Sequence, residues 1–221
     1  MTKSKLNFWE RVRYRKNGLR VSTDGLLRKG QAELAITVPS ADLLREAESF
    51  LRFVAKYLNE THAKITSGQT LNYGYWLVKF QPSGENGLEV WEYNSDGTEF
   101  VHGGALALRY WRDQHAICET YGANFDPPNP ERLTVVSEGV TEGDVLEGIR
   151  YPSPEHMSGW WLLGPEYNGD VKTLKTIHTY HVTSARPDLV QYLALPSGFR
   201  FDIRKGERVC FDPEGANQPP V

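Results

Sequence analysis

Apolar residues recur at helical spacing in two segments of the chain. In residues 42–59 they form one stripe, and charged residues occupy the opposite side. Ser40 stands just before this segment, where its hydroxyl is suited to accept a free backbone N–H at a helix start. In residues 105–121 the same spacing places His115 and Cys118 on one face. The pattern therefore predicts two long helices.

Shorter apolar runs, several of them alternating with polar residues, predict strands around these helices. The expected strands are residues 19–27, 32–38, 70–80, 87–93, 133–136, 148–151, 160–163, 176–182, 199–203 and 208–211. A short helix is expected near residues 187–193. The pattern breaks at residues 123–131, where three prolines in four residues exclude a helix or an inner strand.

These elements predict an α+β fold with two domains. Residues 1–122 are expected to form a helix on an antiparallel sheet, preceded by a basic N-terminal arm. Residues 123–131 would be a proline-rich linker, and residues 132–213 a small, mostly β domain packed against the first. Residues 214–221 are expected to form a frayed tail. The second domain is small enough that it would be marginally stable alone.

The net charge of −3 conceals an uneven distribution along the chain. Residues 1–30 carry nine Lys and Arg against two acids, whereas the other 191 residues carry 16 against 26, a net of −10. The basic arm is either a nucleic-acid contact or a segment lying against its own acidic body. No apolar run approaches the length of a membrane span, and no secretory signal pattern is present, so we expect a cytoplasmic protein.

Candidate catalytic groups are few. His178 and His181 invite a metal interpretation, but a strand at 176–182 would point them to opposite faces. Cys118 and Cys210 both occupy apolar patterns typical of buried, unreactive thiols. The chain contains no phosphate-binding loop, no zinc-protease motif and no serine-hydrolase elbow. We therefore expect no enzyme activity, no cofactor and no metal.

An acidic stretch follows the linker. Glu138, Glu142, Asp144 and Glu147 fall within ten residues that contain no Lys or Arg. Such a stretch is either a solvated loop or a negative patch that steers a positively charged partner. A third interpretation, acid–base catalysis, would require that one carboxyl be buried.

The second part of the chain carries an ordered set of short motifs. They are Val135-Val-Ser137, Gly148-Ile-Arg-Tyr-Pro152, Met157-Ser-Gly-Trp-Trp161, Gly169-Asp170, Leu174-x-x-Ile177, and the run from Ala185 to Phe201. Residues 133–203 thereby resemble the bacterial polymorphic-toxin immunity proteins of family thirty-three, first catalogued as a domain of unknown function. The family has an acid where this chain has Met157, and its acidic turn is thinned here to Glu166 and Asp170.

The resemblance implies a non-enzymatic immunity protein that binds and neutralises a toxin in the cytoplasm. The motif residues that we expect to determine the fold are Ser158, Gly159, Trp160, Pro196 and Gly198, with Trp160 in the core. The expected toxin contacts are Glu138, Glu142, Asp144, Glu147, Trp161, Glu166, Tyr167 and Asp170, and an acidic body favours a basic toxin. Two alternatives stay open: a small-ligand or metal-binding enzyme domain using an interdomain cleft, and a nucleic-acid-associated regulator.

Overall fold

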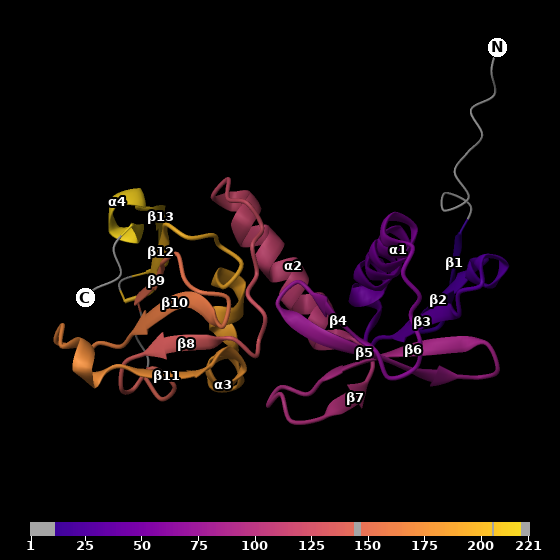
Figure 1. Cartoon of the computed structure of the whole chain (residues 1–221), viewed down its shortest axis with the longest axis horizontal. Helices are drawn as coiled ribbons and strands as arrows, with labels where there is room; N and C mark the ends of the chain where they lie inside the picture. Colours follow the sequence, from indigo (N-terminus) through magenta and orange to yellow (C-terminus); the bar gives the residue numbers. More distant parts are fainter. Residues whose placement is uncertain (1–11, 144–146, 205, 218–221) are drawn as a thin grey trace, which may run out of the picture. The chain divides into compact units, whose positions relative to one another are not determined.

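A computed structural model of the chain describes residues 12–143, 147–204 and 206–217. The fold is mixed α+β, as predicted, with two sheets (Figure 1). The chain divides into two compact units. The first comprises Met1–Tyr73, Leu77–Asn94 and Thr98–Arg109, and the second comprises Gly74–Trp76, Ser95–Gly97 and Tyr110–Val221.

The sheet of the first unit has the order β1-β2-β3-β6-β5-β4, and β7 also pairs with β6. Its strands are β1 (Arg13–Asn17), β2 (Arg20–Asp24), β3 (Glu33–Thr37), β4 (Thr70–Tyr73), β5 (Trp76–Ser83), β6 (Gly87–Tyr93) and β7 (Phe100–His102). One strand pair departs from the predicted antiparallel sheet, because β3 and β6 are parallel. The connection explains this: α1 carries the chain from β3 to β4 at the opposite edge of the sheet. The chain then returns through β5 to β6, which lies beside β3 and runs in the same direction.

Helix α1 (Leu44–Thr61) covers one face of this sheet and confirms the predicted first helix. Its buried stripe includes Phe50, Leu51 and Val54. A 3-10 turn, η3 (Ala41–Leu43), precedes it, and Ser40 has the extended backbone of a cap residue but makes no side-chain capping hydrogen bond. The predicted second helix is α2 (Ala105–Thr120). Its first residues belong to the first unit and the rest to the second.

The sheet of the second unit has the order β11-β8-β10-β9-β12-β13. Its strands are β8 (Leu133–Val136), β9 (Glu147–Arg150), β10 (Met157–Leu163), β11 (Lys175–His178), β12 (Phe199–Asp202) and β13 (Arg208–Phe211). Besides most of α2, its helices are η4 (Val171–Thr173), α3 (Thr179–Ala185), η5 (Pro187–Tyr192) and α4 (Pro213–Ala216). Strands β8 and β10 are parallel, and the other pairs in this sheet are antiparallel.

Four predicted elements need correction. The strand expected at 70–80 is two strands, β4 and β5, because Gly74, with φ 62°, forms a turn between them. The strand expected at 176–182 ends at His178, and α3 follows, because the helical period places Thr179, Val182 and Thr183 together on a buried face. The strand expected at 19–27 ends at Asp24, where Gly25, with φ 122°, leads into the 3-10 turn η2 (Leu26–Lys29). Part of the expected basic arm is the edge strand β1, paired with β2.

The proline-rich segment 123–131 lies within the second unit. The predicted division into domains at residues 122 and 131 stays a prediction. In the described part of the chain, no helix has the length and apolar character needed to cross a bilayer.

Candidate partner-binding site

Two acidic loops of the second unit meet because their strands run parallel. Trp161 and Leu162 of β10 are in register with Val135 and Val136 of β8, so the loops that follow both strands leave the same edge of the sheet. The backbone N–H of Gly164 donates to Ser137 Oγ at 2.8 Å, which ties the two loops together. β11 is antiparallel to β8, and its start brings η4 to the same edge.

A pocket of about 340 Å³ lies between these loops. It is lined by Ser137, Glu138, Gly139, Glu166, Tyr167, Asn168 and Thr173. The structure thus brings together three of the residues singled out in the sequence, Glu138, Glu166 and Tyr167. Both carboxylates are exposed and Tyr167 is half-buried, so a partner can reach all three side chains.

The remaining acidic candidates have different surroundings. Glu142 is exposed, and its own backbone N–H donates to Gly139 O at 3.1 Å, which closes a turn. Asp170 caps η4, accepting from the backbone N–H of Lys172 at 3.0 Å. Asp144 lies outside the described residues.

Glu147 is held by two arginines of its own unit. Its carboxylate lies 2.6 Å from Arg200 and 3.0 Å from Arg204, which themselves pair with Asp212 and Asp202. The hydrogen bonds from Glu147 and Asp212 raise the pKa of Arg200 above its ordinary value. The group lines a second pocket of about 360 Å³ at β12 and β13. Glu147 therefore differs from the loop acids, because arginines of its own unit compensate its charge.

The two neighbouring tryptophans of β10 lie on opposite faces of the sheet. Trp160 is fully buried, as predicted, and its Nε1 donates to Leu193 O at 3.1 Å. Trp161 is only half-buried, and its ring centroid lies 5.6 Å from that of Tyr151. Because side chains alternate along a strand, the burial of Trp160 leaves Trp161 on the opposite face.

The Ser158-Gly159-Trp160 motif and the turn at Pro196–Gly198 depend on close packing of the backbone. Gly159 has φ 81°, and an added Cβ would lie 2.5 Å from Tyr151 O, so a side chain is excluded there. Ser158 Oγ lies 2.7 Å from the Thr134 hydroxyl across the β8–β10 pair. Gly198 has φ 96° and packs against the ring of Phe211, and Pro196 O accepts from the N–H of Phe199 at 3.2 Å.

Sequence reasoning missed Arg150, whose side chain is only 5% exposed. Its guanidinium donates to the carbonyl oxygens of Ser158, Asp126, Leu193 and Leu195. It also lies 3.2 Å from the Asp126 carboxylate. Burial lowers the pKa of Arg150 from its ordinary value, and Asp126 opposes this shift. Nothing in the strand pattern signals a buried arginine, because Asp126, Leu193 and Leu195 lie in loops that are distant from Arg150 in sequence.

The histidine and cysteine candidates from the sequence have different surroundings in the structure. His178 precedes α3 and His181 lies within it, with ring centroids 6.2 Å apart, and the described residues contain no cluster of three potential metal ligands. Cys118 is buried, as predicted, and burial raises the pKa of its thiol. The prediction that Cys210 is buried is wrong: β13 is an edge strand, and the thiol is exposed.

Comparison with known proteins identifies the second unit. Residues 113–212 match the family described as the Imm33-like domain, and the motifs at 133–203 lie inside this match. The chain matches no curated protein and no solved structure. The Imm33-like family is an immunity-protein family and is generally non-enzymatic. The segment from residue 113 to residue 212 is therefore an Imm33-like domain.

Proposed function

We propose that this chain is a non-enzymatic immunity protein that binds a cognate toxin and neutralises it in the cytoplasm. The observation that carries the proposal is the Imm33-like domain over residues 113–212. An immunity protein of this kind acts by occupying its toxin, which requires a complementary interface and no catalytic group of its own. An interface of standard size buries about 1,600 Å² in total.

The pocket between the β8 and β10 loops is the proposed centre of that interface. Glu138 and Glu166 place two exposed carboxylates at a concave site, and Glu142 adds a third on the adjoining turn. Within the described residues, no ion pair involves any of the three. A Lys or Arg side chain of a basic toxin would therefore find uncompensated negative charge there.

Aromatic side chains would supply the apolar part of the contact. Tyr167 lines the pocket itself, and Trp161 is the half-buried tryptophan on the face opposite Trp160. Tryptophan, tyrosine and arginine are the residues that most often carry binding energy at interfaces. Asp144, Glu147 and Asp170 remain predicted contacts, with Glu147 acting through the two arginines that it holds.

Co-expression in a bacterial host tests the proposal. The test uses the toxin domain of a polymorphic toxin taken from a reading frame next to the gene for this chain. We expect the full chain to restore growth and to co-elute with the toxin in size-exclusion chromatography. Persistent killing together with separate elution would refute the assignment.

Charge reversal locates the surface. Glu138→Lys with Glu142→Lys should slow association about tenfold at 25 mM salt and less at 300 mM, because exposed charges steer encounter and are screened. Glu85→Lys with Glu119→Lys changes the net charge equally at exposed positions that do not line the pocket and serves as the control. If both double variants associate alike, the pocket is not the contact surface.

A further inference from the structure

The first unit presents a sheet face that α1 does not cover. Along β5 and β6, Val78 and Val90 are fully buried. On the opposite face Lys79, Gln81, Trp91 and Tyr93 are half-buried, and Glu89 is buried. The cross-strand register places these positions together on one surface, which we term the open face. Its residues are Arg13, Arg15, Arg20, Ser22, Thr37, Lys79, Gln81, Glu89, Trp91, Tyr93, Phe100 and His102.

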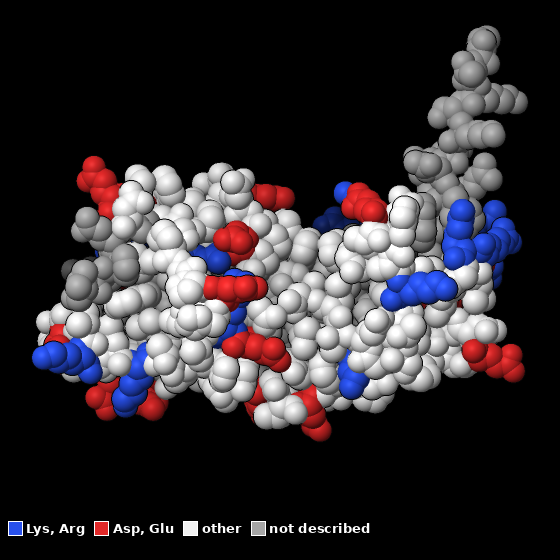
Figure 2. All heavy atoms as spheres, viewed as in Figure 1, with Lys and Arg blue, Asp and Glu red and all other residues white. Residues whose placement is uncertain are grey.

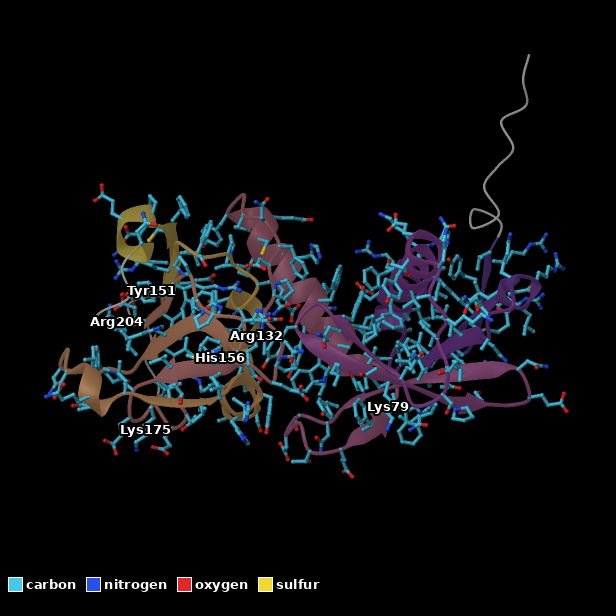
Figure 3. The ribbon with its side chains drawn as sticks, viewed as in Figure 1. Lys79, Arg132, Tyr151, His156, Lys175 and Arg204 are labelled. Atoms are coloured by element: carbon cyan, nitrogen blue, oxygen red, sulfur yellow. The ribbon has the colours of Figure 1, made fainter. Side chains whose placement is uncertain are left out.

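Aromatic rings form two adjacent rows on the open face. Tyr93 stacks on Phe100 with ring centroids 4.4 Å apart, and Trp91 meets His102 edge-on at 5.7 Å. Trp91 and Tyr93 are two residues apart on β6, so their Cα atoms lie about 6.6 Å apart along the strand and their side chains leave the same face. Lys79 Nζ lies 5.0 Å from the Phe100 ring centroid, and Figure 3 shows Lys79 beside β5 and β7.

The carboxylates on or beside the open face form hydrogen bonds and ion pairs with groups of the first unit itself. Asp24 pairs with Arg15, and Glu33 accepts from the backbone N–H groups of Gly25 and Leu27. Glu89 is 11% exposed in its side chain and is surrounded by four partners. They are Thr37 at 2.7 Å, Ser83 at 3.1 Å, Arg20 at 3.1 Å and His102 at 3.2 Å.

The charged side chains of the open face that are still able to contact a ligand are positive. Arg13 is exposed and Lys79 half-buried, and neither forms an ion pair within the described part of the chain. Arg20 and His102 are oriented by Glu89, yet their side chains are 43% and 48% exposed. Figure 2 shows Lys and Arg side chains gathered over β1 and β2.

We propose that the open face binds single-stranded nucleic acid. Arg13, Arg20 and Lys79 would contact phosphates, and Trp91 with the Tyr93–Phe100 pair would stack on bases. Sheets that bind single strands combine these two features, because phosphates need cations while every base offers a ring face. An acidic polypeptide would satisfy the cations but would not use two rows of rings. The proposal does not depend on toxin binding.

Fluorescence anisotropy of a labelled 15-nucleotide oligo-dT or oligo-U, titrated with the full chain at 25 mM salt, tests the proposal. We expect saturable binding that weakens as salt increases. Arg13→Glu with Lys79→Glu should weaken binding at least tenfold, and the salt slope should fall by about 1.4, since each single-strand phosphate contact contributes about 0.7. Trp91→Leu should weaken binding at least fivefold with little change in the salt slope, because stacking releases no counterions.

Lys172→Glu with Lys175→Glu is the matched control, since it changes the net charge equally at exposed positions of the second unit. This variant should bind the oligonucleotides like the unaltered chain. No binding by the unaltered chain up to 50 µM, or equal loss in both double variants, would overturn the proposal. So would competition by poly-glutamate at the same charge concentration, which would identify the occupant as an acidic polypeptide. The Glu138→Lys, Glu142→Lys variant should retain oligonucleotide binding whether or not the immunity assignment holds.

Discussion

The carboxylates of the two units differ in what they bind. In the first unit, four polar side chains form hydrogen bonds or ion pairs with the carboxylate of Glu89 on β6. Glu92 on the same strand accepts hydrogen bonds from the backbone N–H groups of Leu106 and Ala107 at the start of α2. In the second unit, Glu138 and Glu166 project from loops into a pocket, and no ion pair involving either exists among the described residues. The same residue type holds a sheet together in one unit and stays available in the other.

Net charge reflects this difference only weakly. The described part of the second unit has nine Lys and Arg against sixteen Asp and Glu, and the described part of the first has twelve against ten. Counting acids therefore finds the acidic unit but not the acids that a partner can use. Glu147 belongs to the acidic stretch in sequence, yet two arginines neutralise it. Internal partners, more than position in a charged run, separate structural carboxylates from available ones.

The largest effect should come from Arg150, the charged residue with the most internal partners. Arg150→Met removes the donor from four carbonyl oxygens and the ion pair from Asp126, which should cost about 3–5 kcal/mol. Urea unfolding followed by tryptophan fluorescence measures the loss as a lower midpoint for the second unit. Arg208→Met, at an exposed position of β13, is the control and should change stability by less than about 0.5 kcal/mol. Equal midpoints for the two variants would break the link between internal partners and stability.

A smaller effect is expected at Glu89 in the first unit. Glu89→Gln should cost about 3 kcal/mol at pH 7, because hydrogen bonds from Thr37, Arg20 and His102 lower its pKa to about 2 against the opposing effect of burial. A lowered folded-state pKa means that the contribution is complete above the unfolded pKa and disappears as the pH falls from about 4 to about 2. Thermal unfolding from pH 7 to pH 2 measures it.

The unaltered chain and Glu89→Gln should therefore converge in stability toward pH 2. Glu85→Gln, at an exposed position in the β5–β6 turn, should follow the unaltered chain throughout. A constant difference between the unaltered chain and Glu89→Gln from pH 7 to pH 2 would mean that the charge of Glu89 contributes nothing.

Local pattern was sufficient for much of this architecture. The stripe at 42–59 predicts α1, and the apolar runs at 87–93 and 160–163 predict β6 and the second half of β10. The core position of Trp160 is predicted from the motif around Gly159, and the structure confirms it. Pattern failed at Thr179, where β-branched residues typical of a strand form the buried face of a short helix.

The candidate site depended on pairings that local pattern cannot supply. Glu138 and Glu166 were both selected as acids, but only the parallel alignment of β8 with β10 puts their loops at one edge. Glu147 was grouped with Glu142 because they are close in sequence, and its ion pairs come from β12 and the turn after it, more than fifty residues later. The Glu89 cluster likewise collects side chains from five strands, which no motif in one segment predicts.

The smallest change in stability is expected for the loop carboxylates. Glu138→Lys with Glu142→Lys should alter the free energy of unfolding by less than about 0.5 kcal/mol, because exposed side chains without internal ion pairs contribute little to the folded state. Urea midpoints of this double variant and of Glu89→Gln, measured side by side at pH 7, give the contrast directly. A loss above 1 kcal/mol in the loop variant would show that these acids stabilise the Imm33-like domain itself. In that case, slower toxin association by the same variant would report a damaged fold, and the pocket would lose its claim to be the contact surface.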